Sequence, residues 1–94
     1  LPAAARLVSV HPNPFNPQTT VAFTLDREQA VAIAVHDVRG RQVRRLLNTT
    51  LSGGDHAISW NGRDEAGREL PSGVYMVRLK AGEHMQARKM MLVR

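Results

Sequence analysis

The stretch "TTVAFTLDREQAVAIAVHD", residues 19–37, contains two runs in which apolar residues alternate with small or polar ones. Alternation with a period of two is typical of a β-strand that turns one face toward a core. The residues that share the apolar faces are Val21, Phe23, Leu25, Val31, Ile33 and Val35. The stretch therefore predicts two strands, each with one buried face.

Five further runs extend this pattern along the chain and cover residues 5–10, 41–47, 55–60, 73–82 and 85–93. Turn signals with glycine or proline separate most of the runs, and none keeps the apolar spacing of three and four that a helix requires. Strands at this spacing predict an all-β fold, an immunoglobulin-like or fibronectin-III-like antiparallel β-sandwich of about seven strands. The expected core residues are Phe23, Ile33, Val35, Ile58, Trp60, Tyr75, Val77 and Leu79.

The amino-terminal run sets the expected domain boundary. We interpret residues 1–7 as the end of a linker from an upstream domain, and residues 8–94 as one carboxyl-terminal domain. Strict alternation in this run would place Leu7 and Ser9 on one face and Val8 and Val10 on the other.

The charge balance is basic, with 13 Lys and Arg against 8 Asp and Glu and a net charge of +5. The basic residues concentrate in residues 39–45 and 78–94, where the strand pattern places most of them on solvated faces, so we expect no nucleic-acid partner. The chain has no cysteine, which excludes disulfides and thiol chemistry. No apolar run approaches the roughly 18 residues of a membrane-spanning helix, so we expect no membrane insertion.

The segment "HPNPFNPQTT", residues 11–20, combines three prolines with two asparagines. Proline cannot donate to a sheet ladder, so the segment predicts a stiff, extended crossing rather than a central strand. We expect it to carry the first strand from one sheet to the other, with Phe15 closing the edge of the core. The alternative is a recognition segment, because a rigid extended peptide loses little entropy on binding.

The segment "WNGRDEAGRELPSGVY", residues 60–75, contains several turn signals between two aromatic residues. We expect Trp60 and Tyr75 to pack on the same core, with the tyrosine hydroxyl bonded to backbone. A calcium loop built from Asn61, Asp64 and Glu65 would not match EF-hand spacing. The chain also lacks a nucleophile elbow and a phosphate-binding glycine loop. We therefore expect no enzyme activity, no metal site and no cofactor.

The terminal segment "ARKMMLVR", residues 87–94, predicts a last strand held by four apolar residues, Met90, Met91, Leu92 and Val93, with Arg88 and Lys89 in solvent. An edge strand near a free terminus could also add to a partner's sheet.

Three pieces of the sequence, taken in order, carry a family resemblance. They are "NPFNP" at residues 13–17, "WNGRDEAG" leading into "SGVY" at residues 60–75, and the terminal "RKMMLVR". Over residues 8–94 the chain resembles the carboxyl-terminal sorting domain of proteins exported by the type IX secretion system. The same pattern overlaps the immunoglobulin-like domain of the flagellar hook-capping protein family.

The resemblance implies a non-catalytic address label at the end of a larger exported protein, which folds in the periplasm and is delivered to the cell surface or medium. The implied partners are the type IX translocon, surface-attachment proteins, the upstream cargo domains and, after processing, an anionic lipopolysaccharide. By motif match, the sorting-signal residues are Asn13, Pro14, Asn16, Pro17, Gly73, Tyr75, Lys89, Met90, Leu92 and Arg94. Met91 stands where the resembled family more commonly has valine or isoleucine.

Two other functions stay open. A carbohydrate-binding or adhesive sandwich would need exposed aromatic residues, and the four aromatic residues, Phe15, Phe23, Trp60 and Tyr75, are expected mostly in the core. A structural immunoglobulin-like module, as in the hook-capping family, would stabilise a larger assembly and could lie anywhere in a chain, whereas a sorting signal must end the full-length chain.

Overall fold

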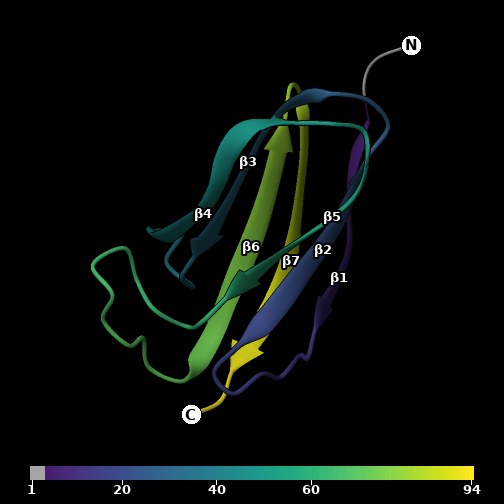
Figure 1. Ribbon diagram of the computed structural model, residues 1–94. Coiled ribbons are helices and arrows are strands. Elements are labelled where there is room, and N and C mark those ends of the chain that lie inside the picture. Colours follow the sequence, from purple (N-terminus) through teal and green to yellow (C-terminus); the bar gives the residue numbers. More distant parts are fainter. Residues whose placement is uncertain (1–3) are drawn as a thin grey trace.

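The computed structural model describes residues 4–94 (Figure 1). In this structure, seven antiparallel strands form two packed sheets. The strands are β1 (Ala5–His11), β2 (Thr19–Leu25), β3 (Gln29–His36), β4 (Gln42–Leu51), β5 (Gly54–Trp60), β6 (Gly73–Ala81) and β7 (His84–Leu92). The first sheet has the order β1-β2-β5, and the second has the order β4-β3-β6-β7. The predicted all-β sandwich is thus confirmed. Within residues 4–94 no helix is long and apolar enough to cross a membrane.

The core lies between the two sheets and is built from the alternating faces that the sequence indicates. The large apolar residues of β2 and β3 are buried, as are the residues on the inner face of β6, whereas the alanines of β2 and β3 lie on the opposite faces. Branched and aromatic side chains suit these pleated, half-buried strands. Among the expected core residues, Ile58 is an exception, because it is partly buried and packs against the edge of the core.

Strand β1 departs from the strict alternation expected for it. A register shift between Leu7 and Ser9, relative to β2, inserts Val8 as an extra residue. Leu7 and Val10 therefore both face the core, while Val8 is 48% exposed. A β-bulge changes the side-chain period locally, which a pattern of period two cannot anticipate. The strand begins at Ala5, which is buried, so the sandwich starts before the boundary at residue 8 that the sequence suggested.

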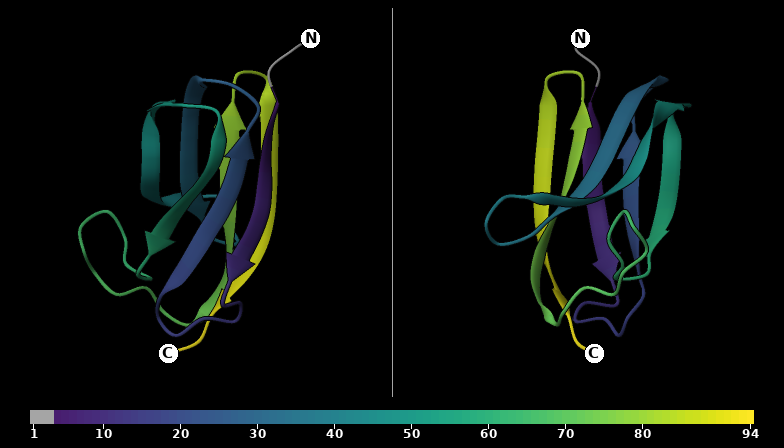
Figure 2. Two further views of the ribbon diagram at one scale, coloured as in Figure 1. Left: turned by 45° about the vertical axis from the view of Figure 1, so that its right-hand side comes forward. Right: turned by 90° about the vertical axis from the view of Figure 1, so that its left-hand side faces the viewer.

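The edges of the two sheets meet on one side of the sandwich, where β1 lies beside β7 (Figure 2). The side chain of Gln86 accepts a hydrogen bond from the amide of Leu7 at 2.6 Å, and Arg88 donates to the carbonyl oxygen of Val8 at 2.9 Å. These bonds join the sheets and satisfy backbone groups of β1 where the bulge interrupts its pairing.

Candidate recognition surface at the carboxyl-terminal end of the sandwich

The three motif segments singled out in the sequence meet at one end of the molecule, the end marked C in Figures 1 and 2. Antiparallel pairing of β6 with β7 places Gly73 opposite Leu92 and Tyr75 opposite Met90. The proline-rich loop between β1 and β2 reaches the same place, where Phe15 forms a parallel bridge with Leu92. We call this end, made by residues 12–17, 61–73 and 89–94, the terminal surface.

The proline-rich segment occupies the free edge of β7 instead of joining two sheets. The amide of Phe15 donates to the carbonyl oxygen of Met91 at 2.9 Å, and the amide of Val93 donates to the carbonyl oxygen of Phe15 at 2.8 Å. The expectation of a crossing between sheets is wrong, because β1 and β2, which the segment connects, are neighbours in the first sheet.

Asn13 extends this contact with its side chain. Its Nδ2 donates to the carbonyl oxygen of Lys89 at 3.1 Å, and its Oδ1 accepts from the amide of Met91 at 2.9 Å. Backbone groups of residues 89–93 that would otherwise be open to a partner strand are therefore paired within the domain. The folded domain does not offer this half of β7 for strand addition.

An aromatic cluster supports the terminal surface from inside. The ring of Trp60 lies 5.5 Å from that of Phe15 and 5.6 Å from that of Tyr75, measured between centroids. The hydroxyl of Tyr75 donates to the carbonyl oxygen of Pro71 at 2.7 Å, and the indole nitrogen of Trp60 donates to that of Arg63 at 3.0 Å. The predicted common core and the predicted backbone partner of the tyrosine are both confirmed. Burial raises the pKa of Tyr75 above its ordinary value.

Arg94 holds the segment between β5 and β6 against the end of β7. Its guanidinium donates to the carbonyl oxygen of Gly62 at 2.7 Å and to the carboxylate of Glu69 at 3.0 Å, and its Nε donates to the carbonyl oxygen of Leu70. Its backbone amide donates to the hydroxyl of Ser72 at 2.9 Å. This side chain is part of the fold as well as part of the matched motif.

The residues of the terminal motif divide by their exposure. Met90 and Leu92 are 1% and 0% exposed, whereas Met91 and Val93 are 43% and 44% exposed. The expectation that all four apolar residues hold the strand is thus half right, because alternation in β7 turns only every second side chain inward. On the intact fold, a partner could contact the outward-facing pair but not the buried pair.

A turn that occurs twice in the chain, once within the terminal surface, was not anticipated from the sequence. The segments "DVRGR", residues 37–41, and "DEAGR", residues 64–68, share Asp at the first position, Gly at the fourth and Arg at the fifth. In both, the aspartate Oδ1 accepts bonds from the third and fifth amides at 2.9 to 3.0 Å, and the arginine pairs with the same carboxylate. Comparison of the two turn signals in the sequence could have revealed the repeat.

These contacts control the ionisation of both aspartates. The hydrogen bond from the backbone amide of Arg68 holds the pKa of Asp64 below its ordinary value. The positive charge of the Arg68 side chain and the bond from the amide of Ala66 act in the same direction. Burial alone would raise the pKa of Asp37, but the amides of Arg41 and Arg39 and the charge of Arg41 outweigh it and lower the pKa. The carboxylate of Asp64 is therefore already bonded to groups of its own turn. Within residues 4–94, no group of three or more His, Asp or Glu could hold a metal ion.

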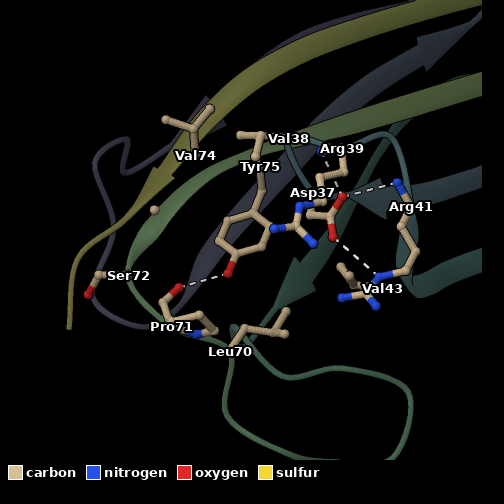
Figure 3. Close-up of a pocket in the computed structure, with 11 residues that line it drawn as sticks. Asp37, Val38, Arg39, Arg41, Val43, Leu70, Pro71, Ser72, Val74 and Tyr75 are labelled. Carbon is tan, nitrogen blue, oxygen red and sulfur yellow. Dashed lines mark hydrogen bonds and ion pairs between the residues drawn. The ribbon is translucent and has the colours of Figure 1, made fainter.

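A hollow of about 270 Å³ separates the first of these turns from the segment that leads into β6 (Figure 3). Its lining includes Asp37, Arg41, Val43, Leu70 and Tyr75. Figure 3 shows the Asp37 carboxylate engaged with Arg41 and the Tyr75 hydroxyl engaged with Pro71. The carboxylate of Asp37 and the hydroxyl of Tyr75 thus form bonds that stabilise the loops around the hollow.

The comparisons with known proteins agree with this architecture. A family model described as the FlgD Ig-like domain matches residues 13–84. No curated protein sequence matches the chain. Among solved structures, PorU from Porphyromonas gingivalis, described as a dimeric latent form, matches 99% of the chain with a TM-score of 0.80 and 22% identity. PorZ from the same organism, described as an essential surface component of the type IX secretion system, matches 93% with a TM-score of 0.65 and 21% identity.

FlgD from P. aeruginosa matches 79% of the chain and 58% of its own length, with a TM-score of 0.62 and 21% identity. The chain spans only about a tenth of the PorU and PorZ chains, 10% and 11% respectively. At these identities the structural matches establish the shared fold, and the family model covers most of the sequence. The chain belongs to the family of FlgD Ig-like domains.

Proposed function

We propose that this domain is a non-catalytic, carboxyl-terminal sorting signal, which directs a larger exported protein through the type IX secretion system to the cell surface or medium. The observation that carries the proposal is the convergence of the three motif segments on the terminal surface. Asn13 and Phe15 bind the backbone of β7, and Arg94 binds the segment that follows Trp60. A partner at this end of the domain would meet all three segments together.

The similarity to PorU and PorZ supports this assignment, since PorZ is described as a component of the type IX system. The proposed partners are the translocon and surface-attachment proteins, which contact the domain while it is joined to its cargo. The proposed route passes through the periplasm. Attachment of the cargo to an anionic lipopolysaccharide would follow processing.

The test is a fusion of residues 1–94 behind a signal peptide and a reporter, in a bacterium with a working type IX system. Deletion of residues 89–94 would remove the buried Met90 and Leu92, so it would confuse loss of folding with loss of recognition. A better variant is Met91→Ser with Val93→Ser, which changes exposed side chains at the terminal surface. Its matched control is Val8→Ser with Met85→Ser, which changes side chains 48% and 60% exposed elsewhere.

The proposal predicts delivery of the wild-type fusion and of the control, with the terminal-surface variant held in the periplasm in folded form. If the folded wild-type fusion itself stays in the periplasm, the domain is not a sorting signal. If the two double variants are delivered equally, the outward side chains of the terminal motif are not the part that the partner contacts.

A structural module is the second candidate, and membership of the FlgD Ig-like family favours it. Such a module would stabilise a larger assembly without being a secretion signal, and its fusion would remain in the periplasm. A platform that stacks sugar rings on aromatic side chains has less support, because Phe15, Phe23, Trp60 and Tyr75 are at most 4% exposed.

A further inference from the structure

The charged Arg, Lys, Asp and Glu residues in the strands of the second sheet are all positive. Its four strands, β4, β3, β6 and β7, contain no Asp or Glu. They carry six Arg and Lys residues, namely Arg44, Arg45, Arg78, Lys80, Arg88 and Lys89. The net positive charge of the domain is therefore concentrated in this sheet.

Strand register gathers four of these cations on the outer face. Arg45 on β4 and Arg78 on β6 both pair with Ala34 of β3, one from each side. Lys80 pairs with Ala32, and Lys89 pairs with Met76. Because the inner face of β6 is defined by the buried Tyr75, Val77 and Leu79, the partners of Ala32 and Ala34 point outward.

The geometry of the strands fixes the spacing of these positions. Neighbouring strands lie about 4.8 Å apart, so the backbones that carry Arg45 and Arg78 are about 10 Å apart. Arg78 and Lys80 are two residues apart on one strand, which corresponds to about 7 Å. We call the surface formed by Arg45, Arg78, Lys80 and Lys89 around these alanines the basic face.

The four side chains of the basic face are exposed, and none pairs with a carboxylate of residues 4–94. The other two cations of the sheet are engaged. Arg44 lies 3.9 Å from the carboxylate of Glu65, and Arg88 donates to carbonyl oxygens of β1. Glu65 also accepts a bond from the backbone amide of Arg45, whereas the side chain of Arg45 is exposed and forms no ion pair with a carboxylate of residues 4–94.

We propose that the basic face binds an acidic polysaccharide, a linear sugar chain that carries carboxylate, sulfate or phosphate groups. Several unpaired cations within about 10 Å of one another attract a polymer with repeated negative charges. The small alanine side chains between them let an extended chain approach the sheet. Single-stranded nucleic acid fits less well, because it binds through stacking on exposed aromatic residues, and those of this domain are buried. This inference does not depend on the sorting function.

The test uses the isolated chain and three probes at about 0.15 M salt: dextran sulfate, polygalacturonate and neutral dextran, with affinity measured by calorimetry. We expect both anionic polymers to bind and neutral dextran not to bind. Arg78→Gln with Lys80→Gln should weaken binding at least tenfold and reduce its dependence on salt. The matched control, Arg6→Gln with Arg39→Gln, removes the same charge outside the basic face and should change affinity less than twofold.

Alanine methyl groups report the location by NMR. On addition of dextran sulfate, the signals of Ala32 and Ala34 should shift, whereas those of Ala22 and Ala57, which pair with each other in the first sheet, should not. The proposal is overturned if wild type does not bind the anionic polymers, or if both double variants lose affinity equally. Equal affinity for a single-stranded oligonucleotide would also overturn it in favour of general polyanion attraction. None of these outcomes would alter the delivery of the reporter fusion.

Discussion

Arg94 donates a hydrogen bond from Nη2 to the carbonyl oxygen of Gly62 over 2.7 Å, across a separation of 32 residues. The same arginine binds Glu69 and Leu70, so one side chain fixes the whole segment between β5 and β6. The terminal motif and the turn that follows Trp60 are therefore a single structural unit, although they lie far apart in the sequence.

Substitution of Arg94 should expose this dependence. Its side chain is 24% exposed and makes several charge-assisted bonds, so Arg94→Ala should lower the free energy of unfolding by about 2 kcal/mol. Urea denaturation measures the change. Arg39→Ala, in an exposed turn, is the control and should cost less than about 0.5 kcal/mol. Equal effects of the two substitutions would mean that Arg94 does not hold the segment.

Gly62 should resist substitution more than other glycines with positive φ. Its φ is +74°, and an added Cβ would lie 3.0 Å from Nη2 of Arg94 and 3.1 Å from the carbonyl oxygen of Pro17. Gly82 has a φ of +60° but open space around it. We expect Gly82→Ala to cost about 1 to 2 kcal/mol from backbone strain, and Gly62→Ala to cost about 1 kcal/mol more. Comparable midpoints in urea would contradict the close approach.

The side chain of Asn13 should stabilise the edge of β7 and slow hydrogen exchange of its backbone amides. Asn13→Ala removes both side-chain bonds to the strand and should cost about 1 to 2 kcal/mol. Hydrogen exchange gives the local test: the amide of Met91 should exchange faster, while that of Val93, bonded to Phe15, should change less. Asn16→Ala, also before a proline, is the control, since the Asn16 side chain makes no hydrogen bond within residues 4–94. An unchanged exchange rate of the Met91 amide in Asn13→Ala would contradict the prediction.

Tyr75 should stabilise the folded domain through the hydrogen bond of its hydroxyl and through its burial. Tyr75→Phe removes the bond to Pro71 and should cost about 1 kcal/mol at neutral pH. The raised pKa means that the stabilising neutral phenol is fully present below the ordinary value of 10.0 and is lost as the pH rises through the higher folded value. Because Tyr75 is the sole tyrosine, ultraviolet absorption of the phenolate follows it directly. Titration at or below pH 10.0 in the folded protein would be inconsistent with this environment.

Asp64 should make the domain sensitive to acid. Its pKa is lowered in the folded state, so its contribution is present above the ordinary value of 3.8 and is lost as the pH falls toward the lower folded value. The melting temperature should therefore decrease below about pH 3.8, and Asp64→Asn should reduce that decrease. Asp55→Asn serves as control, since the Asp55 carboxylate accepts no hydrogen bond within residues 4–94. Identical acid profiles for wild type and Asp64→Asn would exclude the role of this turn.

The sequence was sufficient to predict the strands and their buried faces. The alternation in residues 19–37 is a local property, and a single core behind the sheet selects which face turns inward. The inward positions of Trp60 and Tyr75 followed from the same pattern. The exposure of Val8 did not, because Val8 lies in a bulge that forms only when β1 pairs with β2. The partial exposure of Ile58 did not follow from the pattern either.

The proposed recognition residues were selected by motif match, but the contacts that they make in the fold are not contained in the sequence. Asn13 bonds to a strand 78 positions away, and Arg94 bonds to Gly62 across 32. Local alternation determined by itself that this chain forms a sandwich of amphipathic strands, because the period of a strand is set by its own backbone. The tertiary structure decided which strands became neighbours, that the proline-rich segment closes the edge of β7, and that the cations of the second sheet share one face. These outcomes depend on which distant segments pair when the chain folds, and strand pairing across long separations is set by the packing of the whole core.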